Sequence, residues 1–282
     1  MAGTLSRSWQ LVKETWRVLS KDKELIVFPV ISGLAVLVII ASFIVPLLFS
    51  GLFSVTVMPA IWFLLLFGFY LLTYFIVIFF NCGLIAAAYI RLNGGDPTVG
   101  DGLHYAAGHT GQIFVWAVIS ATVGLVLSLI RNRGGAAGSL VAGIAGTAWS
   151  LVTFFVIPVM IFEEKGVLPA IKDSMALFKK TGGENIIGSI GIGLVILPVI
   201  LVFFVVFAAI ITGSPLVVPF IILLIILVGV CGVVYSALRG IFVTALYIYA
   251  RTGTVPEAFS GDLIQGAFRE KDEGRKPLRG TI

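Results

Sequence analysis

The length of the uncharged apolar stretches constrains this chain more than any other feature. Residues with charged side chains are absent between Glu24 and Arg91, Asp101 and Arg131, Arg133 and Glu163, and Glu184 and Arg239. An apolar helix of about 20 residues crosses the hydrocarbon core of a bilayer. The first and last stretches are long enough for two such helices each, and the middle two for one each. The sequence therefore predicts six membrane spans.

The composition excludes a soluble globular protein, because 59% of the 282 residues are hydrophobic and only 12% are charged. Backbone groups inside hydrocarbon must form hydrogen bonds within their own segment, so long apolar runs such as Ile61 to Phe80 must be helices. We predict an all-α fold, a polytopic transmembrane bundle of six spans arranged as three hairpins, with amphipathic helices on the cytoplasmic side.

One membrane domain is predicted over residues 1–268, followed by a charged, flexible tail over residues 269–282. The predicted spans cover residues 25–50, 58–90, 111–131, 136–162, 185–212 and 216–250. Shorter helices are predicted at the membrane surface over residues 5–20, 97–109, 168–180 and 256–268.

The distribution of basic residues predicts the orientation. Of the 19 Lys and Arg residues, only Arg131 and Arg133 fall in a loop on the side away from the termini. Cytoplasmic loops carry the excess of positive charge. We therefore expect a multi-pass protein of the cell (inner) membrane with both termini in the cytoplasm.

Two of the surface segments have a clear apolar stripe. In the first, Leu5, Trp9, Val12, Trp16 and Leu19 recur at steps of four and three. This helix either lies in the headgroup layer, with Trp9 and Trp16 as interfacial anchors, or docks on the protein's own helix ends. In the second, the stripe is Leu168, Ile171, Met175 and Phe178, with Lys172, Lys179 and Lys180 away from it.

Small residues recur at steps of four on two predicted spans: Gly135, Ser139, Gly143 and Thr147 on one, and Gly232, Ser236, Gly240 and Thr244 on the other. Such stripes let two helix backbones approach closely. We interpret both as helix-packing faces, and a lipid or substrate groove is the alternative.

An internal repeat is suggested by the segments that begin at Ala87 and Ala245, which match at Ala, Tyr, Ile and a final Gly without a gap. The predicted unit is a surface helix followed by a hairpin, present three times; chance similarity between apolar segments is the alternative. The alignment pairs Asn81 with Arg239, a charge inside an otherwise apolar run. Arg239 either extends to the headgroups or binds a lipid phosphate or anionic ligand.

Chemistry that would support catalysis is not evident in the sequence. All 14 acidic residues lie outside the apolar stretches, so no intramembrane carboxylate is available for proton relay. On a helix, His104 and His109 point about 140° apart and cannot share a metal ion. We predict no catalytic residues, metal site or cofactor, and no binding of nucleic acid.

Several motifs follow one another in the order of a known pattern: Ser8-Trp9, Lys21 to Leu25, Phe28-Pro29, Asp101 to Leu103, Ala121 to Leu125, Thr153 to Pro158, Thr181 to Asn185 and Ala245 to Tyr247. With these motifs the chain resembles an uncharacterised family of prokaryotic six-helix membrane proteins. It is more loosely similar to the membrane domains of glycerophosphodiester phosphodiesterases. At Gly182 the family pattern has Trp, so one interfacial anchor is missing here. The resemblance implies a fold and a prokaryotic inner membrane, and no catalytic residue.

The functional expectation is a non-enzymatic membrane protein that organises lipid or a partner through its surface helices. Expected partners are membrane lipids with anionic headgroups, and a second copy of the chain or another membrane protein. The alternative is a channel or transporter for ions, small solutes or lipids, with Asn81 and Arg239 lining an inner vestibule. A cavity that reaches at least the middle of the membrane distinguishes the alternative.

Overall fold

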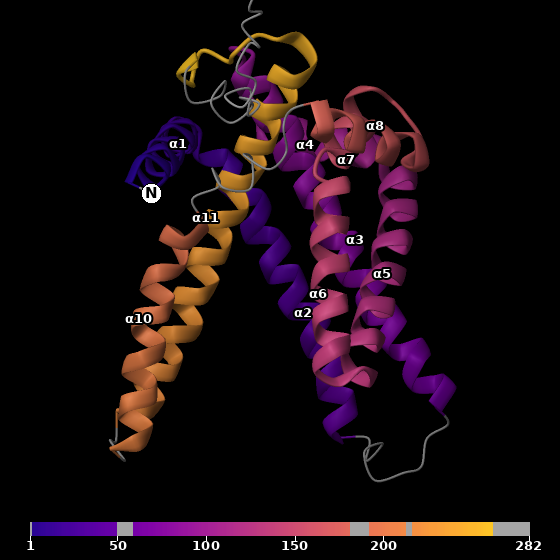
Figure 1. The fold of residues 1–282 in the computed structure, drawn as a ribbon, viewed down its shortest axis with the longest axis vertical. Helices are drawn as coiled ribbons and strands as arrows, with labels where there is room; N and C mark the ends of the chain where they lie inside the picture. Colours follow the sequence, from indigo (N-terminus) through magenta and orange to yellow (C-terminus); the bar gives the residue numbers. More distant parts are fainter. Residues whose placement is uncertain (1, 50–58, 181–191, 213–215, 262–282) are drawn as a thin grey trace, which may run out of the picture.

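The computed structural model describes residues 2–49, 59–180, 192–212 and 216–261, and every regular element in these ranges is a helix (Figure 1). This confirms the all-helical class. The elements in chain order are α1 (Ala2–Lys21), the short 3-10 helix η1 (Lys23–Ile26), α2 (Val27–Phe49), α3 (Pro59–Leu92), α4 (Val99–Gly108), α5 (Thr110–Arg133), α6 (Gly135–Val152), α7 (Val156–Phe162), α8 (Val167–Lys180), α10 (Ile192–Ile211) and α11 (Val217–Thr252).

Five helical segments in the described ranges are long and apolar enough to cross a membrane: Lys23–Phe49, Ile61–Leu92, Thr110–Arg133, Gly135–Phe162 and Val217–Thr252. These segments identify a multi-pass membrane protein. Helix α10 falls in the fifth predicted span, with a shorter apolar part at Pro198–Phe207. The predicted start of that span at residue 185 and the predicted helix beyond residue 261 lie outside the described residues. The count of six stays a prediction.

Helices that follow one another pack as neighbours in three pairs, α2 with α3, α5 with α6, and α10 with α11. Helix α3 is central, because it also packs against α4, α5 and α11. Figure 1 shows α1, α4, α7 and α8 gathered at one end of the spans, while the α10–α11 hairpin diverges from α5 and α6 toward the other end.

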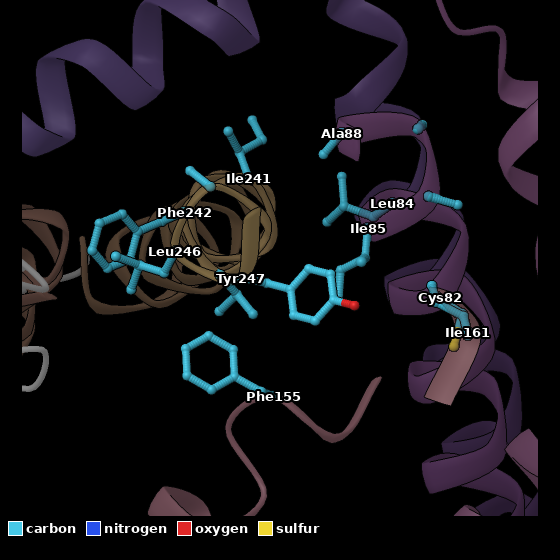
Figure 2. Close-up of a cluster of buried hydrophobic side chains, with 14 of the residues drawn as sticks. Cys82, Leu84, Ile85, Ala88, Phe155, Ile161, Ile241, Phe242, Leu246 and Tyr247 are labelled. Atoms are coloured by element: carbon cyan, nitrogen blue, oxygen red, sulfur yellow. The ribbon is translucent and has the colours of Figure 1, made fainter. Parts of the chain in front are cut away.

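The buried core lies at the end where the short helices gather. Helix α11 is buried from Ala237 to Ile248 except at Arg239, and α3 is buried over its last turns. Figure 2 shows Ile241 and Leu246 of α11 in the same cluster as Leu84 of α3. A Cβ atom on Gly240 would lie 2.5 Å from Leu84 Cδ2, so glycine permits this close approach of the two helices.

The far halves of the spans expose large apolar side chains, for example Leu64, Leu140 and Ile225. Burying such a side chain away from water is worth about 1.5–3 kcal/mol. The exposed surface of the far halves is therefore suited to lipid and not to water.

The span predicted over residues 136–162 corresponds to the apolar segment Gly135–Phe162, but the helix is interrupted within this segment. Helix α6 ends at Val152, and α7 begins at Val156. Pro158 explains the break, because its ring would clash with the carbonyl of Phe154 and it cannot donate a hydrogen bond. The buried hydroxyl of Ser174 in α8 accepts a hydrogen bond from the backbone N–H of Phe155 at 2.9 Å, which stabilises the break.

The first junction helix, α4, begins just after Pro97. The Thr98 hydroxyl accepts from the Asp101 N–H at 3.2 Å, and Asp101 Oδ2 accepts from the Thr98 N–H at 2.8 Å, a capping box. These bonds from the Thr98 backbone and hydroxyl lower the pKa of Asp101. Glu24 of η1 accepts the N–H of Val99 at 2.7 Å, so the segment before α2 holds the start of α4.

Residues matched by the proposed repeat meet around one aromatic ring. Phe162, at the end of α7, has its ring centroid 4.2 Å from that of Tyr89 and 5.6 Å from that of Tyr247. The repeat pairs Tyr89 with Tyr247. The three repeated units themselves stay a prediction.

Candidate functional site: an intramembrane cleft and two surface helices

A cleft of about 400 Å³ lies between α11 and the group formed by α2, α3, α5 and α6. Its lining includes several polar side chains and one charged side chain, although it lies within predicted spans. The polar lining residues are Ser32, Tyr74, Asn81, Ser120, Ser150, Thr153, Tyr235, Ser236 and Arg239.

The cleft extends from the level of the buried core toward the middle of the spans. Asn81 and Arg239 lie about 15 Å and 18 Å along their helices from Arg91 and Arg251, at 1.5 Å per residue. Tyr74 lies about 10 Å deeper than Asn81 along α3. The polar end is therefore nearer the gathered short helices, and the other end lies deeper.

The structure brings Asn81 and Arg239 to the same cleft. In the described part of the chain, neither side chain has a hydrogen bond or ion pair to another residue, and the Arg239 side chain is exposed. A Cβ atom on Gly240 would lie 3.8 Å from Asn81 Oδ1, so the turn of α11 that carries Arg239 lies next to Asn81. The arrangement presents unpaired donors of both side chains to the cleft.

Two tryptophans form part of the cleft wall. Trp116 of α5 and Trp149 of α6 stack with ring centroids 5.7 Å apart. Deeper in the cleft, a Cβ atom on Gly124 would lie 2.9 Å from the hydroxyl oxygen of Tyr74, so α5 approaches this side chain closely. These residues were not predicted from the sequence, although Ser120 and Gly124 lie four residues apart on one span, on the α5 face that lines the cleft.

Helix α1 both docks on the protein and presents tryptophans outward. Helix α1 packs against α11, and its buried residues are Leu11, Thr15, Val18 and Leu19. Trp9 and Trp16 remain 53% and 49% exposed. The predicted stripe is therefore divided: Leu19 is buried and Val12 packs against the core, whereas Trp9 and Trp16 point outward.

The docked position of α1 is supported by the end of the chain that the structure describes. Glu14 accepts hydrogen bonds from the backbone N–H of Ser260 at 3.1 Å and from its hydroxyl at 2.9 Å. These bonds join α1 to the segment that follows α11.

Helix α8 covers α6 and α7 with one face and exposes cations on another. Val167, Ala170 and Leu177 are buried, whereas Leu168 and Met175 are exposed. Lys172 and Lys179 are exposed, and neither lines the cleft that contains Arg239. The side chain of Lys180 lies outside the described residues.

The small-residue stripe on α6 faces outward in the part of the chain that the structure describes, and its role as a helix-packing face stays a prediction. Ser139, Gly143 and Thr147 line a shallow outer groove, and a Cβ atom on Gly143 would meet nothing within 4 Å. Gly135 has a φ of 56° and begins the helix. Its role is the turn between α5 and α6, where a left-handed backbone favours glycine.

The stripe on α11 divides among three environments. Gly240 packs on Leu84 of α3, as expected of a close helix contact. Ser236 lines the cleft, and Gly232 faces open space. Only one end of this stripe is a helix contact within the described chain.

A charged cluster ties the second junction to the end of α11. Glu163 pairs with Arg251, with Lys165 at 2.8 Å, and with the Tyr247 hydroxyl at 3.1 Å; Lys165 also pairs with Asp173. Partial burial alone would raise the pKa of the Glu163 carboxyl, but the hydrogen bonds from Lys165, Arg251 and Tyr247 outweigh burial and lower it. This cluster links residues more than 80 positions apart.

Metal-binding chemistry is not assembled in the ranges that the structure describes, where no three His, Cys, Asp or Glu residues are grouped. The ring of His109 instead stacks on Tyr105 with centroids 5.3 Å apart, and its Nδ1 is hydrogen-bonded to the Tyr105 carbonyl at 2.8 Å.

No curated protein matches this chain. A family model matches residues 60–257, which include the central helix α3, the cleft residues Asn81 and Arg239, and the Glu163 cluster. The chain belongs to this family, a family of unknown function (DUF6159).

Proposed function

We propose that this protein is a non-enzymatic protein of the prokaryotic inner membrane that organises lipid on the cytoplasmic side, where both termini lie. The observation that carries the proposal is the exposure of Trp9 and Trp16 on a helix whose other side is docked on α11. Tryptophan is enriched where a protein surface meets the headgroup layer. A docked helix holds its tryptophans at a fixed depth.

Basic residues accompany the exposed apolar side chains on both surface helices. Lys13 and Arg17 are exposed on α1, and Lys172 and Lys179 are exposed on α8. Each basic residue near an anionic membrane surface contributes about 1 kcal/mol to binding. The two helices together therefore favour contact with anionic headgroups over zwitterionic ones.

Quenching of tryptophan by brominated lipid tests this function. A variant with Trp62, Trp116 and Trp149 replaced by Phe keeps Trp9 and Trp16 as the reporters. In vesicles, lipid brominated near the headgroup should quench both, and more strongly in brominated phosphatidylglycerol than in brominated phosphatidylcholine. The double variant Lys13→Gln, Arg17→Gln should reduce this preference. Absence of quenching in both lipids would refute the proposal.

A second candidate, a channel or transporter, is favoured by one specific observation. The cleft extends along α5 from Trp116 to Leu127, about 17 Å at 1.5 Å per residue. A cavity of this extent provides part of a path through the spans. The candidate predicts flux of ions or small solutes across proteoliposomes that Arg239→Gln alters. Vesicles that stay as tight as protein-free vesicles would exclude conduction under the conditions tested.

A further inference from the structure

We infer that the cleft is a binding site for one phospholipid with a net anionic headgroup, whose phosphate is held by Arg239 and Asn81 and whose acyl chain runs toward Tyr74. This goes beyond the proposed function, which concerns the surface helices. The two sites are separate, because α1 and α8 contribute no residue to the cleft lining.

The positive charge of Arg239 supports an anionic ligand. The Arg239 guanidinium has no hydrogen-bonded or ionic partner within the described residues, and it lies in a cleft bordered by apolar spans. A guanidinium has five donors in a planar fork that matches two oxygens of one phosphate. Asn81 lies next to the same turn of α11, with its Oδ1 toward Gly240, and its side-chain amide nitrogen carries two further donors. An anion at this position satisfies both groups.

The change in polarity along the cleft supports a lipid as the ligand. Arg239, the charged residue of the cleft lining, lies toward the end that Ser32 and Thr153 line, whereas Val77, Val123 and Leu127 line the deeper end beside Tyr74 and Tyr235. With the short helices on the cytoplasmic side, this gradient has the orientation of an inner-leaflet lipid, headgroup toward the cytoplasm and chain toward the bilayer centre. A free inorganic anion would make no use of the apolar end.

The position and the volume of the cleft also suit a lipid. Helix α11 packs on α3 and α2 and diverges from α6 in the direction of the far end (Figure 1). A lipid can therefore enter sideways from the bilayer. The volume of about 400 Å³ lies in the usual range for ligand sites, about 300–1,000 Å³. It admits a headgroup and the beginning of a chain, while the remaining acyl carbons stay among the surrounding lipid.

The test uses the tryptophans of the cleft. A full-length variant with Trp9, Trp16 and Trp62 replaced by Phe keeps only Trp116 and Trp149. Purified in detergent, it is titrated with phosphatidylglycerol or phosphatidylcholine brominated on the acyl chain. We expect saturable quenching by phosphatidylglycerol at one lipid per chain, and one retained lipid in native mass spectrometry.

The charge variant is Arg239→Gln, and its matched control is Arg133→Gln, which removes an exposed cation that does not line the cleft. We expect Arg239→Gln to weaken phosphatidylglycerol binding about tenfold or more, since charge-assisted hydrogen bonds are lost. The control should bind as the parent does. Equal binding by the two variants, or equal affinity for the two lipids, overturns the inference.

A second variant keeps the charge and removes the space. Ser236→Phe places a ring in the cleft and should abolish the saturable quenching even though Arg239 is present. Unchanged quenching in Ser236→Phe overturns the site. Excess inorganic phosphate is the last arm: if it displaces phosphatidylglycerol and binds Arg239 without lipid, the ligand is a free anion and the inference fails.

The outcomes separate the two proposals. Quenching of Trp9 and Trp16 without quenching of Trp116 and Trp149 leaves the proposed function in place and removes the cleft lipid. The reverse result removes the function of the surface helices and keeps the cleft lipid.

Discussion

Replacing Gly102 by Ala tests how closely α4 packs on the helices that carry the cleft. Gly102 is buried in α4, and a Cβ atom there would lie 2.6 Å from the carbonyl oxygen of Gly83 in α3 and 2.8 Å from Phe28 Cε1. Contacts below 3.0 Å do not occur for real Cβ atoms, so something must move. The Gly83 carbonyl is part of the backbone in the interior of α3, so it cannot move as the end of a flexible side chain could.

The magnitude follows from two opposing terms. Within a helix, Gly→Ala gains up to about 1 kcal/mol from backbone entropy and propensity. An extra methyl in a filled site costs about 1–3 kcal/mol. We expect Gly102→Ala to be destabilised by about 1 kcal/mol. Gly108 lies in the same helix, where a Cβ would meet nothing within 4 Å, so Gly108→Ala should be neutral or gain up to about 1 kcal/mol.

The measurement is thermal unfolding of both variants in one detergent, followed by intrinsic fluorescence. A difference of about 2 kcal/mol between them corresponds to about 4–8 °C in Tm for a chain of this size. If Gly102→Ala unfolds at the same temperature as Gly108→Ala, or above it, the close approach of α4 to α3 is wrong.

Three further predictions concern the junctions. The pKa of the Glu163 carboxyl is lowered in the folded protein, so its ionised form stabilises the fold at pH values above the ordinary carboxyl pKa, and this stabilisation is lost as the pH falls through the folded pKa. Glu163→Gln should therefore lower Tm at neutral pH and make Tm less dependent on pH in the acid range. Ser174→Ala leaves the Phe155 N–H without its acceptor and should cost about 1–2 kcal/mol in unfolding measurements; no change would mean that water replaces the hydroxyl. An impermeant thiol reagent should label Lys172→Cys only in inside-out vesicles and Arg131→Cys only in right-side-out vesicles, and the opposite pattern would invert the proposed orientation.

The helices could be predicted from the sequence because the residues that cause a helix to form lie within the helix itself. The absence of charge over tens of residues defines an apolar helix wherever it lies in the fold. The start of α4 was also predictable, since Pro97 favours a helix start immediately after it, and Thr98 and Asp101 form the cap within one turn. The break before α7 could have been predicted from Pro158, but two other prolines, Pro46 and Pro198, lie within helices without ending them.

Features that depend on distant neighbours were not predictable from one chain. Helix α1 has apolar residues on two adjoining sides, and only the position of α11 decides that Leu11 and Val18 face inward while Trp9 does not. The stripe on α6 has the spacing of a packing face, yet no helix of the described chain lies against Gly143. The alignment matched Asn81 with Arg239 as equivalent positions of a repeat, and their place in one cleft required the relative positions of α3 and α11. The stacking of Trp116 on Trp149 likewise required the relative positions of α5 and α6.

The one-sided burial of α11 gives the α10–α11 hairpin a mechanical property. The helix is clamped from Ala237 to Ile248, and the rest of its length, back to Val217, extends about 30 Å from the clamp at 1.5 Å per residue. A rotation of about 5° at the clamp therefore moves the far tip by roughly 3 Å. Arg239 lies at the edge of the clamp, so a tilt of α11 that begins beside this residue produces its largest displacement at the far tip.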